Sequence, residues 1–198
     1  MLTRAIGKAC QFIIQQIVRA LSLSHIHPNY LTALGLVINA VAAVLFARGS
    51  FVAAGLVVVA AGLFDMVDGR VARLTNTVTP FGAFFDSVVD RYSDVALYIG
   101  LLVYYARAEH FFYVVLVALV MAGSVMISYA RARAESLIPT CKVGFLERPE
   151  RVVLIIIGAL FNRMAPVLWI MAVLSNITVI HRIVYTWQYT QKEMVSSS

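Results

Sequence analysis

The chain has 198 residues, of which 61% are hydrophobic and 13% are charged, and its net charge is +6. Soluble domains carry roughly 25% charged residues, and several apolar runs in this chain reach the length of about 18 residues that is typical of a membrane span. The composition therefore excludes an ordinary soluble domain. It predicts a single all-α integral membrane domain over residues 1–198. The positive charge indicates cytoplasmic loops and contact with anionic membrane lipids, not binding to nucleic acid.

Polar side chains recur every three or four positions in residues 2–22, on an otherwise apolar stretch. This pattern is typical of an amphipathic helix, so residues 1–24 are predicted to form a juxtamembrane helix in the interface. A helix packed on the bundle is the alternative. Residues 25–190 are predicted to form six transmembrane helices, and residues 191–198 a polar tail. The expected spans cover residues 29–47, 52–74, 81–105, 111–134, 149–161 and 165–188.

The basic residues predict the orientation of these spans. Of the 16 Lys and Arg residues, only Arg48, Arg107 and Arg163 fall near the turns on one side. By the positive-inside rule the opposite side faces the cytoplasm, and both termini lie there. The expected location is therefore the plasma or inner membrane, with a multi-pass topology.

All five aspartates of the chain lie within one window of 30 residues, inside apolar sequence. A carboxylate in hydrocarbon is unfavourable by several kcal/mol unless it has a partner. Asp65 and Asp68 share one helix face near the cytoplasmic end of the second span, and Asp86 and Asp90 share another near the start of the third. Both pairs are therefore expected at a similar shallow depth.

Four carboxylates across a narrow gap are hard oxygen ligands, which suit Mg²⁺ or Mn²⁺. Such a set favours a site with two metal ions, which commonly handles phosphoryl chemistry. Two alternatives remain at this point: the aspartates could serve only as buried ion-pair partners, or they could line a path for proton or cation transport. Their clustering at one end of the bundle argues against transport.

The spacing Asp65-x₂-Asp68-Gly69-x₂-Ala72-Arg73-x₈-Gly82-x₃-Asp86-x₃-Asp90 resembles the signature of the CDP-alcohol phosphotransferase family. The lead helix and six spans are similar too. The resemblance implies transfer of a phosphatidyl-type group from a CDP-linked lipid, CDP-diacylglycerol or CDP-archaeol, to an alcohol with release of CMP. It also implies that Asp65, Asp68, Asp86 and Asp90 hold the metal ions, that Asp90 is the general base, and that the enzyme is a homodimer.

The resemblance further implies a set of contacts to the CDP-lipid. These residues are Asn29, Thr32, Gly69, Ala72, Arg73, Thr79 and Gly82. Helix capping is the other interpretation for Asn29 and Thr32, and helix packing is the other interpretation for Ala72 and Gly82. Asp94 lies outside the signature and is expected either to support the metal site or to pair with Arg91.

Three arginines at the cytoplasmic helix ends, Arg131, Arg151 and Arg182, point to the acceptor. Guanidinium groups bind phosphate oxygens with paired donors, so the arginines predict an acceptor that carries its own phosphate. The segments that contain Arg131 and Arg151 resemble the branch of the family that uses inositol 1-phosphate. Glycerol 3-phosphate is the alternative acceptor, and a cation transporter is the distant alternative function.

Overall fold

The computed structural model describes residues 28–74 and 79–196, with side chains for residues 29–65 and 79–194. The described residues are all-helical, as the composition predicts. The juxtamembrane helix expected over residues 1–24 lies outside them. The six helices are α2 (Pro28–Ala47), α3 (Phe51–Leu74), α4 (Pro80–Arg107), α5 (Phe111–Ala134), α6 (Arg148–Leu160) and α7 (Met164–Ser196).

Each predicted span coincides with one helix, and the bounds differ by no more than two residues except at the end of α7. That helix continues to Ser196, so it extends beyond the predicted span and through most of the segment predicted as a polar tail. No Gly or Pro ends the helix there, and polar residues alone do not stop one. Tyr185 and Tyr189 also pack against Ile138 and Cys141 of the loop before α6, which stabilises the extension.

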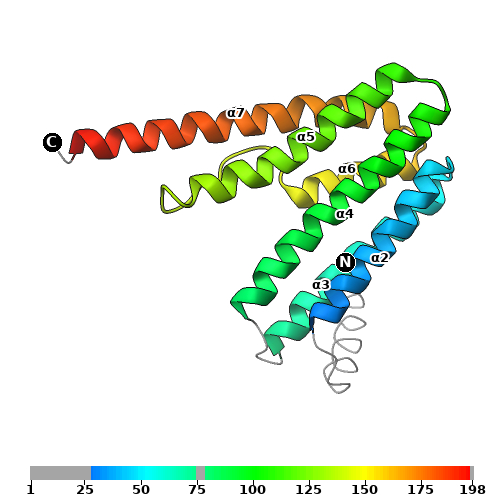
Figure 1. The fold of residues 1–198 in the computed structure, drawn as a ribbon, viewed down its shortest axis with the longest axis horizontal. Coiled ribbons are helices and arrows are strands. Elements are labelled where there is room, and N and C mark those ends of the chain that lie inside the picture. Colours follow the sequence, from blue (N-terminus) through cyan, green and yellow to red (C-terminus); the bar gives the residue numbers. More distant parts are fainter. Residues whose placement is uncertain (1–27, 75–78, 197–198) are drawn as a thin grey trace, which may run out of the picture.

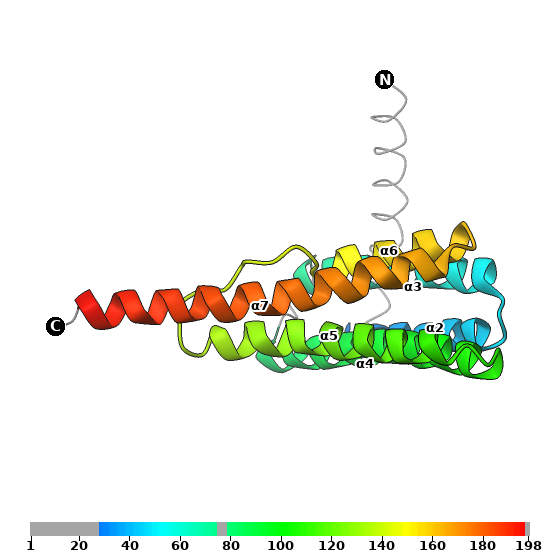
Figure 2. The ribbon, with the colours of Figure 1, turned by 90° about the horizontal axis from the view of Figure 1, so that it is seen from above.

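The helices form two layers, one with α2, α4 and α5 and the other with α3, α6 and α7 (Figure 2). Helix α2 packs against α3 and α4, and α7 packs against α5 and α6. The turns between α2 and α3, between α4 and α5, and between α6 and α7 lie at one end of the bundle (Figure 1). The predicted site residues therefore lie towards the other end.

The contact between α2 and α4 depends on a buried glycine. A Cβ at Gly100 would lie 2.3 Å from the carbonyl oxygen of Ala43, so no larger residue fits without moving a backbone. Small residues allow such close approach between helices in membranes. Because α2 and α4 are held together along their length, their first turns also lie side by side, and both carry predicted contacts for the CDP-lipid.

Three described helices are long and apolar enough to cross a membrane by length and composition: Asn29–Ala47, Phe111–Ala134 and Met164–Met194. Helix α4 is long, but it carries the three acidic residues Asp86, Asp90 and Asp94. Helix α6 has 13 residues, which is about 20 Å and shorter than the hydrocarbon core of about 30 Å. The charged and short helices are the ones that build the candidate site.

Candidate functional site

Helices α3, α4 and α6 meet at a group of carboxylates, Asp65, Asp86 and Asp90, which we call the acid centre. Arg148 of α6 lies between two of them: its Nη1 is 2.9 Å from Asp65 Oδ2 and 3.0 Å from Asp90 Oδ1. The third, Asp86, interacts electrostatically with both Asp65 and Arg148. The predicted convergence of the second and third spans is therefore seen in the distances of Asp65 and Asp90 to Arg148.

The acid centre differs from the prediction in how its gap is filled. Helices α3 and α4 each pack along α2, and a side chain from α6 lies between their carboxylates. The side chain of Asp68 lies outside the described residues, although its backbone belongs to α3. Arg91 is on the other side of Asp90, with its Nη1 4.0 Å from Asp90 Oδ2, and it donates a hydrogen bond to the Ser87 carbonyl.

The start of α4 is built by local sequence. Thr79 is the N-cap: its Oγ1 accepts a hydrogen bond from the Gly82 backbone N–H at 2.9 Å, and Pro80 follows at the first helical position. Both are strong helix-start signals. They fix the helical register, so that Asp86 and Asp90 come to lie one turn apart on the same face.

The acid centre fits a divalent cation by the chemistry of its donors. One oxygen of Asp65 and one of Asp90 already share a single cationic atom of Arg148, so these hard ligands can face one positive centre. Among the side chains that are described, no three acidic, His or Cys groups form a complete ligand set. A cavity of about 370 Å³ adjoins the acid centre, lined by Asp65, Asp94, Arg148 and apolar side chains of α3, α4 and α6.

Part of the predicted CDP-lipid set lies together where α2 and α4 begin. A Cβ built on Gly82 would lie 3.0 Å from Thr79 Oγ1 and 3.6 Å from Asn29 Oδ1. Thr32 is buried one turn further along α2. The other members belong to the last turns of α3, and their side chains lie outside the described residues: Gly69, Ala72 and Arg73.

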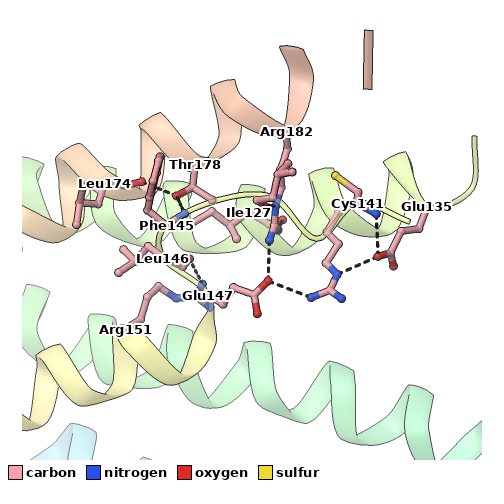
Figure 3. Close-up of polar contacts among 12 residues, drawn as sticks. Ile127, Glu135, Cys141, Phe145, Leu146, Glu147, Arg151, Leu174, Thr178 and Arg182 are labelled. Atoms are coloured by element: carbon pink, nitrogen blue, oxygen red, sulfur yellow. Dashed lines mark hydrogen bonds and ion pairs between the residues drawn. The ribbon is translucent and has the colours of Figure 1, made fainter. Parts of the chain in front are cut away.

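Two of the three predicted acceptor arginines converge on one carboxylate. Arg131 Nη1 and Arg182 Nη2 are each 3.3 Å from Glu147 Oε1, and Figure 3 shows Glu147 beside Arg182. Arg131 also donates from Nε to Glu135 Oε1 at 3.1 Å. Desolvation raises the pKa of Glu135, but hydrogen bonds from Arg131 and from the Cys141 backbone outweigh it and lower this pKa below its usual range. Glu135 therefore stays ionised and holds Arg131.

Arg182 is held in place by backbone carbonyls as well. It is 2% exposed, and it donates from Nε to the Val143 oxygen at 2.9 Å and from Nη1 to the Ile127 oxygen. The loop reaches Arg182 because Gly144 has a φ of +127°, and a Cβ there would lie 2.5 Å from Thr178. Only glycine adopts this conformation readily. The guanidinium is therefore fixed even without Glu147.

The third predicted arginine, Arg151, has a different partner. It is 1% exposed, and its Nη2 lies 2.8 Å from Asp94 Oδ2. Arg148 Nε lies 3.6 Å from the other oxygen of Asp94. Of the two roles expected for Asp94, the pairing with Arg91 is not seen, and Asp94 pairs with two arginines of α6 instead. The physical reason is that the long side chains of Arg148 and Arg151 reach from α6 to this buried carboxylate of α4 and supply two cations to it.

Sequence reasoning missed the roles of Arg148 and Glu147. Both lie within four residues of Arg151, but only Arg151 was singled out from the sequence there. A signal was present: Arg148 and Arg151 are three residues apart at the start of a helix, so they share a face. If one of them faces the bundle, the other must do so too.

Comparison with known proteins matches residues 25–187 to the family described as CDP-alcohol phosphatidyltransferase. The archaetidylinositol phosphate synthase of Methanothermobacter thermautotrophicus is 36% identical over 166 residues, which cover 81% of this chain and 83% of the relative.

Two crystal structures of the phosphatidylinositol phosphate synthase of Mycobacterium tuberculosis are also similar. The structure with bound CDP-DAG superimposes with a TM-score of 0.83 at 34% identity, covering 88% of this chain and 94% of that one. The structure in complex with manganese and citrate gives a TM-score of 0.79 at 33% identity, covering 88% of each chain.

A helical membrane bundle with carboxylates gathered at one end, beside a cluster of arginines, defines a membrane enzyme of phosphoryl chemistry. The match of residues 25–187 to the family is more specific than this general class. The chain belongs to the CDP-alcohol phosphatidyltransferase family, and it is a metal-dependent transferase of phospholipid biosynthesis.

Proposed function

We propose that this enzyme transfers a phosphatidyl or archaetidyl group from CDP-diacylglycerol or CDP-archaeol to the hydroxyl of myo-inositol 1-phosphate. The products are the phosphatidylinositol or archaetidylinositol phosphate and CMP. The family to which the chain belongs supports this type of reaction. The names of two relatives, an archaetidylinositol and a phosphatidylinositol phosphate synthase, support the choice of acceptor.

One structural observation carries the proposal for a phosphorylated acceptor. Arg131 and Arg182 come from different helices, yet both direct a guanidinium nitrogen to the same oxygen, Glu147 Oε1, at 3.3 Å. Two guanidinium groups that share one anionic oxygen are arranged as a receptor for an anion. A phosphate group offers more oxygens and more charge than the carboxylate, so it would displace Glu147 from this position.

In the proposed reaction, Asp90 removes the proton from the attacking hydroxyl of the acceptor. The hydroxyl oxygen forms a bond to the lipid-linked phosphorus, the bond from that phosphorus to the bridging oxygen breaks, and CMP leaves with the electron pair. Arg148 holds the side chain of Asp90 in place through an ion pair of 3.0 Å. Divalent cations bound at the acid centre would neutralise the diphosphate and the leaving group.

We assign the metal positions to Asp65, Asp68, Asp86 and Asp90 and expect two ions, Mg²⁺ or Mn²⁺. The manganese in the structure of the mycobacterial relative supports a divalent cation. Asn29, Thr32, Gly69, Ala72, Arg73, Thr79 and Gly82 are the proposed CDP-lipid contacts. The closeness of Asn29, Thr79 and Gly82 at the starts of α2 and α4 supports part of that set.

The proposed topology has an interfacial helix at residues 1–24 followed by six spans, with both termini and the active site on the cytoplasmic side of the membrane. A shallow site suits a lipid substrate, because its tails stay in the bilayer while its diphosphate lies near the headgroups. The homodimer that the family resemblance implies stays a prediction, and cross-linking in native membranes tests it.

The deciding experiment supplies purified protein with a CDP-lipid, a divalent cation and one acceptor at a time, and measures CMP release. We expect turnover with inositol 1-phosphate and little with free inositol, serine or glycerol 3-phosphate. Turnover with glycerol 3-phosphate alone would replace the proposed acceptor while leaving the reaction type intact. Ion flux through proteoliposomes without CDP-lipid would instead support a transporter.

A further inference from the structure

Asp94 is a buried carboxylate that the family signature does not include. It is 6% exposed and lies on α4, one turn after Asp90. Each of its oxygens faces a different arginine of α6: Oδ2 is 2.8 Å from Arg151 Nη2, and Oδ1 is 3.6 Å from Arg148 Nε. A single carboxylate therefore accepts a hydrogen bond from Arg151 and lies within ion-pair distance of Arg148.

The two arginines lead to different parts of the site. Arg148 uses Nη1 to contact Asp65 and Asp90 in the acid centre. Arg151 donates from Nη1 to the carbonyl oxygen of Leu146 at 3.5 Å, and that residue directly precedes Glu147. Figure 3 shows Arg151, Leu146 and Glu147 close together at the start of α6. Asp94 thus contacts both Arg148, which belongs to the acid centre, and Arg151, which is one of the arginines proposed to bind the acceptor.

One N–H donor of Arg151, at Nε, is not used by these contacts. Among the described residues its Nε has no hydrogen-bond partner, although the side chain is almost fully buried. A buried donor of this kind is unfavourable unless a ligand satisfies it. Because the contact with Asp94 uses Nη2 and the contact with Leu146 uses Nη1, the plane of the guanidinium is fixed while Nε stays available.

We propose that Asp94 is a positioning residue for the acceptor: its charge fixes the orientation in which Arg151 receives the acceptor phosphate. This inference rests on the proposed function, because it concerns the acceptor side of that reaction. A contribution to folding alone is the competing explanation, since removing one partner of a buried ion pair costs about 3–5 kcal/mol in many proteins. The two explanations predict different changes in the KM for the acceptor.

The test compares Asp94→Asn with wild type in detergent or nanodiscs, with inositol 1-phosphate and CDP-lipid varied separately. Asn keeps the size of the side chain and removes its charge. We expect the KM for inositol 1-phosphate to rise about tenfold or more, the KM for CDP-lipid to stay within about twofold, and kcat to change less than the acceptor KM. Tenfold corresponds to about 1.4 kcal/mol.

Ile155→Ala is the matched control, because Ile155 is buried in the hydrophobic core on the same helix, one turn after Arg151. It should lower the melting temperature, by a loss of about 2–5 kcal/mol in stability, without changing the acceptor KM. If Asp94→Asn behaves in the same way, Asp94 is structural and the proposal is overturned. A fall in acceptor KM would also overturn it, because Asp94 would then compete with the phosphate for Arg151.

Wild-type turnover separates this result from the proposed function. If wild type releases CMP with inositol 1-phosphate and the variant shows an unchanged acceptor KM, only the role of Asp94 fails. If wild type is inactive with inositol 1-phosphate, the proposed acceptor itself fails. Should Asp94→Asn not fold, Asp94→Glu provides the second comparison: it keeps the charge, and because its longer side chain shifts Arg151, the acceptor KM should again rise.

Discussion

Arg148 Nη1 lies 3.0 Å from Asp90 Oδ1, which joins the first residue of α6 to the predicted general base on α4. The same nitrogen is 2.9 Å from Asp65 Oδ2. The arginine thus contacts the carboxylates at the position where a divalent ion would have to bind. This relationship makes the proposed base, the proposed metal ligands and the arginine interdependent, and the first three predictions follow from it.

Asp90→Asn should reduce turnover by at least about 10²–10⁴-fold, the usual contribution of a general acid or base. The amide cannot accept the proton of the acceptor hydroxyl. CDP-lipid binding, followed as a ligand-dependent rise in melting temperature, should persist. Glu150→Gln is the matched control, because it makes the same chemical change at an exposed acid on α6. Turnover close to wild type in Asp90→Asn would remove Asp90 as the base.

Arg148→Gln should bind Mn²⁺ more tightly than wild type, by about tenfold, which corresponds to about 1.4 kcal/mol. The arginine and the ion compete for the same oxygens of Asp65 and Asp90, so removing the arginine favours the ion. Titration followed by electron paramagnetic resonance measures the affinity without relying on activity. Arg91→Gln is the comparison, since Arg91 is 4.0 Å from Asp90 and should matter less. Weaker Mn²⁺ binding in Arg148→Gln would contradict the competition.

Removal of divalent ions with a chelator should abolish CMP release while leaving the helical content and the melting temperature nearly unchanged. The reason is that Arg148 pairs with Asp65 and Asp90, so the carboxylates are not left facing one another without a cation. Circular dichroism follows the fold, and adding back Mg²⁺ or Mn²⁺ should restore turnover. Unfolding on chelation would mean that the ions, and not Arg148, hold the three helices together.

Glu147→Gln should lower the KM for inositol 1-phosphate several-fold, because the carboxylate occupies the position between Arg131 and Arg182 that the phosphate requires. Arg182 would keep its orientation through the carbonyl oxygens of Val143 and Ile127. Steady-state kinetics with varied acceptor provide the measurement. Glu135→Gln is the comparison, since Glu135 contacts Nε of Arg131 and not the shared position. A higher acceptor KM in Glu147→Gln would show that this residue positions the arginines.

Arg182→Lys should raise the acceptor KM about tenfold or more. A compact ammonium group cannot reach two carbonyl oxygens and Glu147 at once, and each hydrogen bond from a charged group contributes about 1.5–3 kcal/mol. The KM for CDP-lipid should stay within about twofold. Arg133→Lys, at an exposed arginine near the end of α5, controls for the loss of a guanidinium. Equal changes in both KM values would indicate a general disturbance of the site.

The helices and the acid centre could be predicted from the sequence because both depend on local spacing. Apolar runs predict the bounds of α2 to α6 to within two residues, and steps of three and four predict which aspartates share a face. Topology then brings Asp65 near Asp90. These steps need no knowledge of how distant side chains pack.

The partners of the arginines could not be predicted in this way. Asp94 pairs with Arg151 because the long arginine side chain reaches it from α6, and the choice of Arg151 over Arg91 depends on distances that no sequence pattern contains. The same applies to Glu147, which contacts arginines from α5 and α7. The end of α7 was mispredicted for a related reason, since Tyr185 and Tyr189 are stabilised by a loop distant in sequence.

The contacts proposed for the two substrates are carried by different helices. Asn29, Thr79 and Gly82 lie where α2 and α4 begin, whereas the acceptor arginines belong to α5, α6 and α7. Such a division permits modular divergence: substitutions in the segment around Glu147 and along α7 could change which alcohol reacts, while the nucleotide-lipid side and the acid centre stay intact. An engineered enzyme with a new headgroup specificity should therefore be sought by varying the acceptor helices alone.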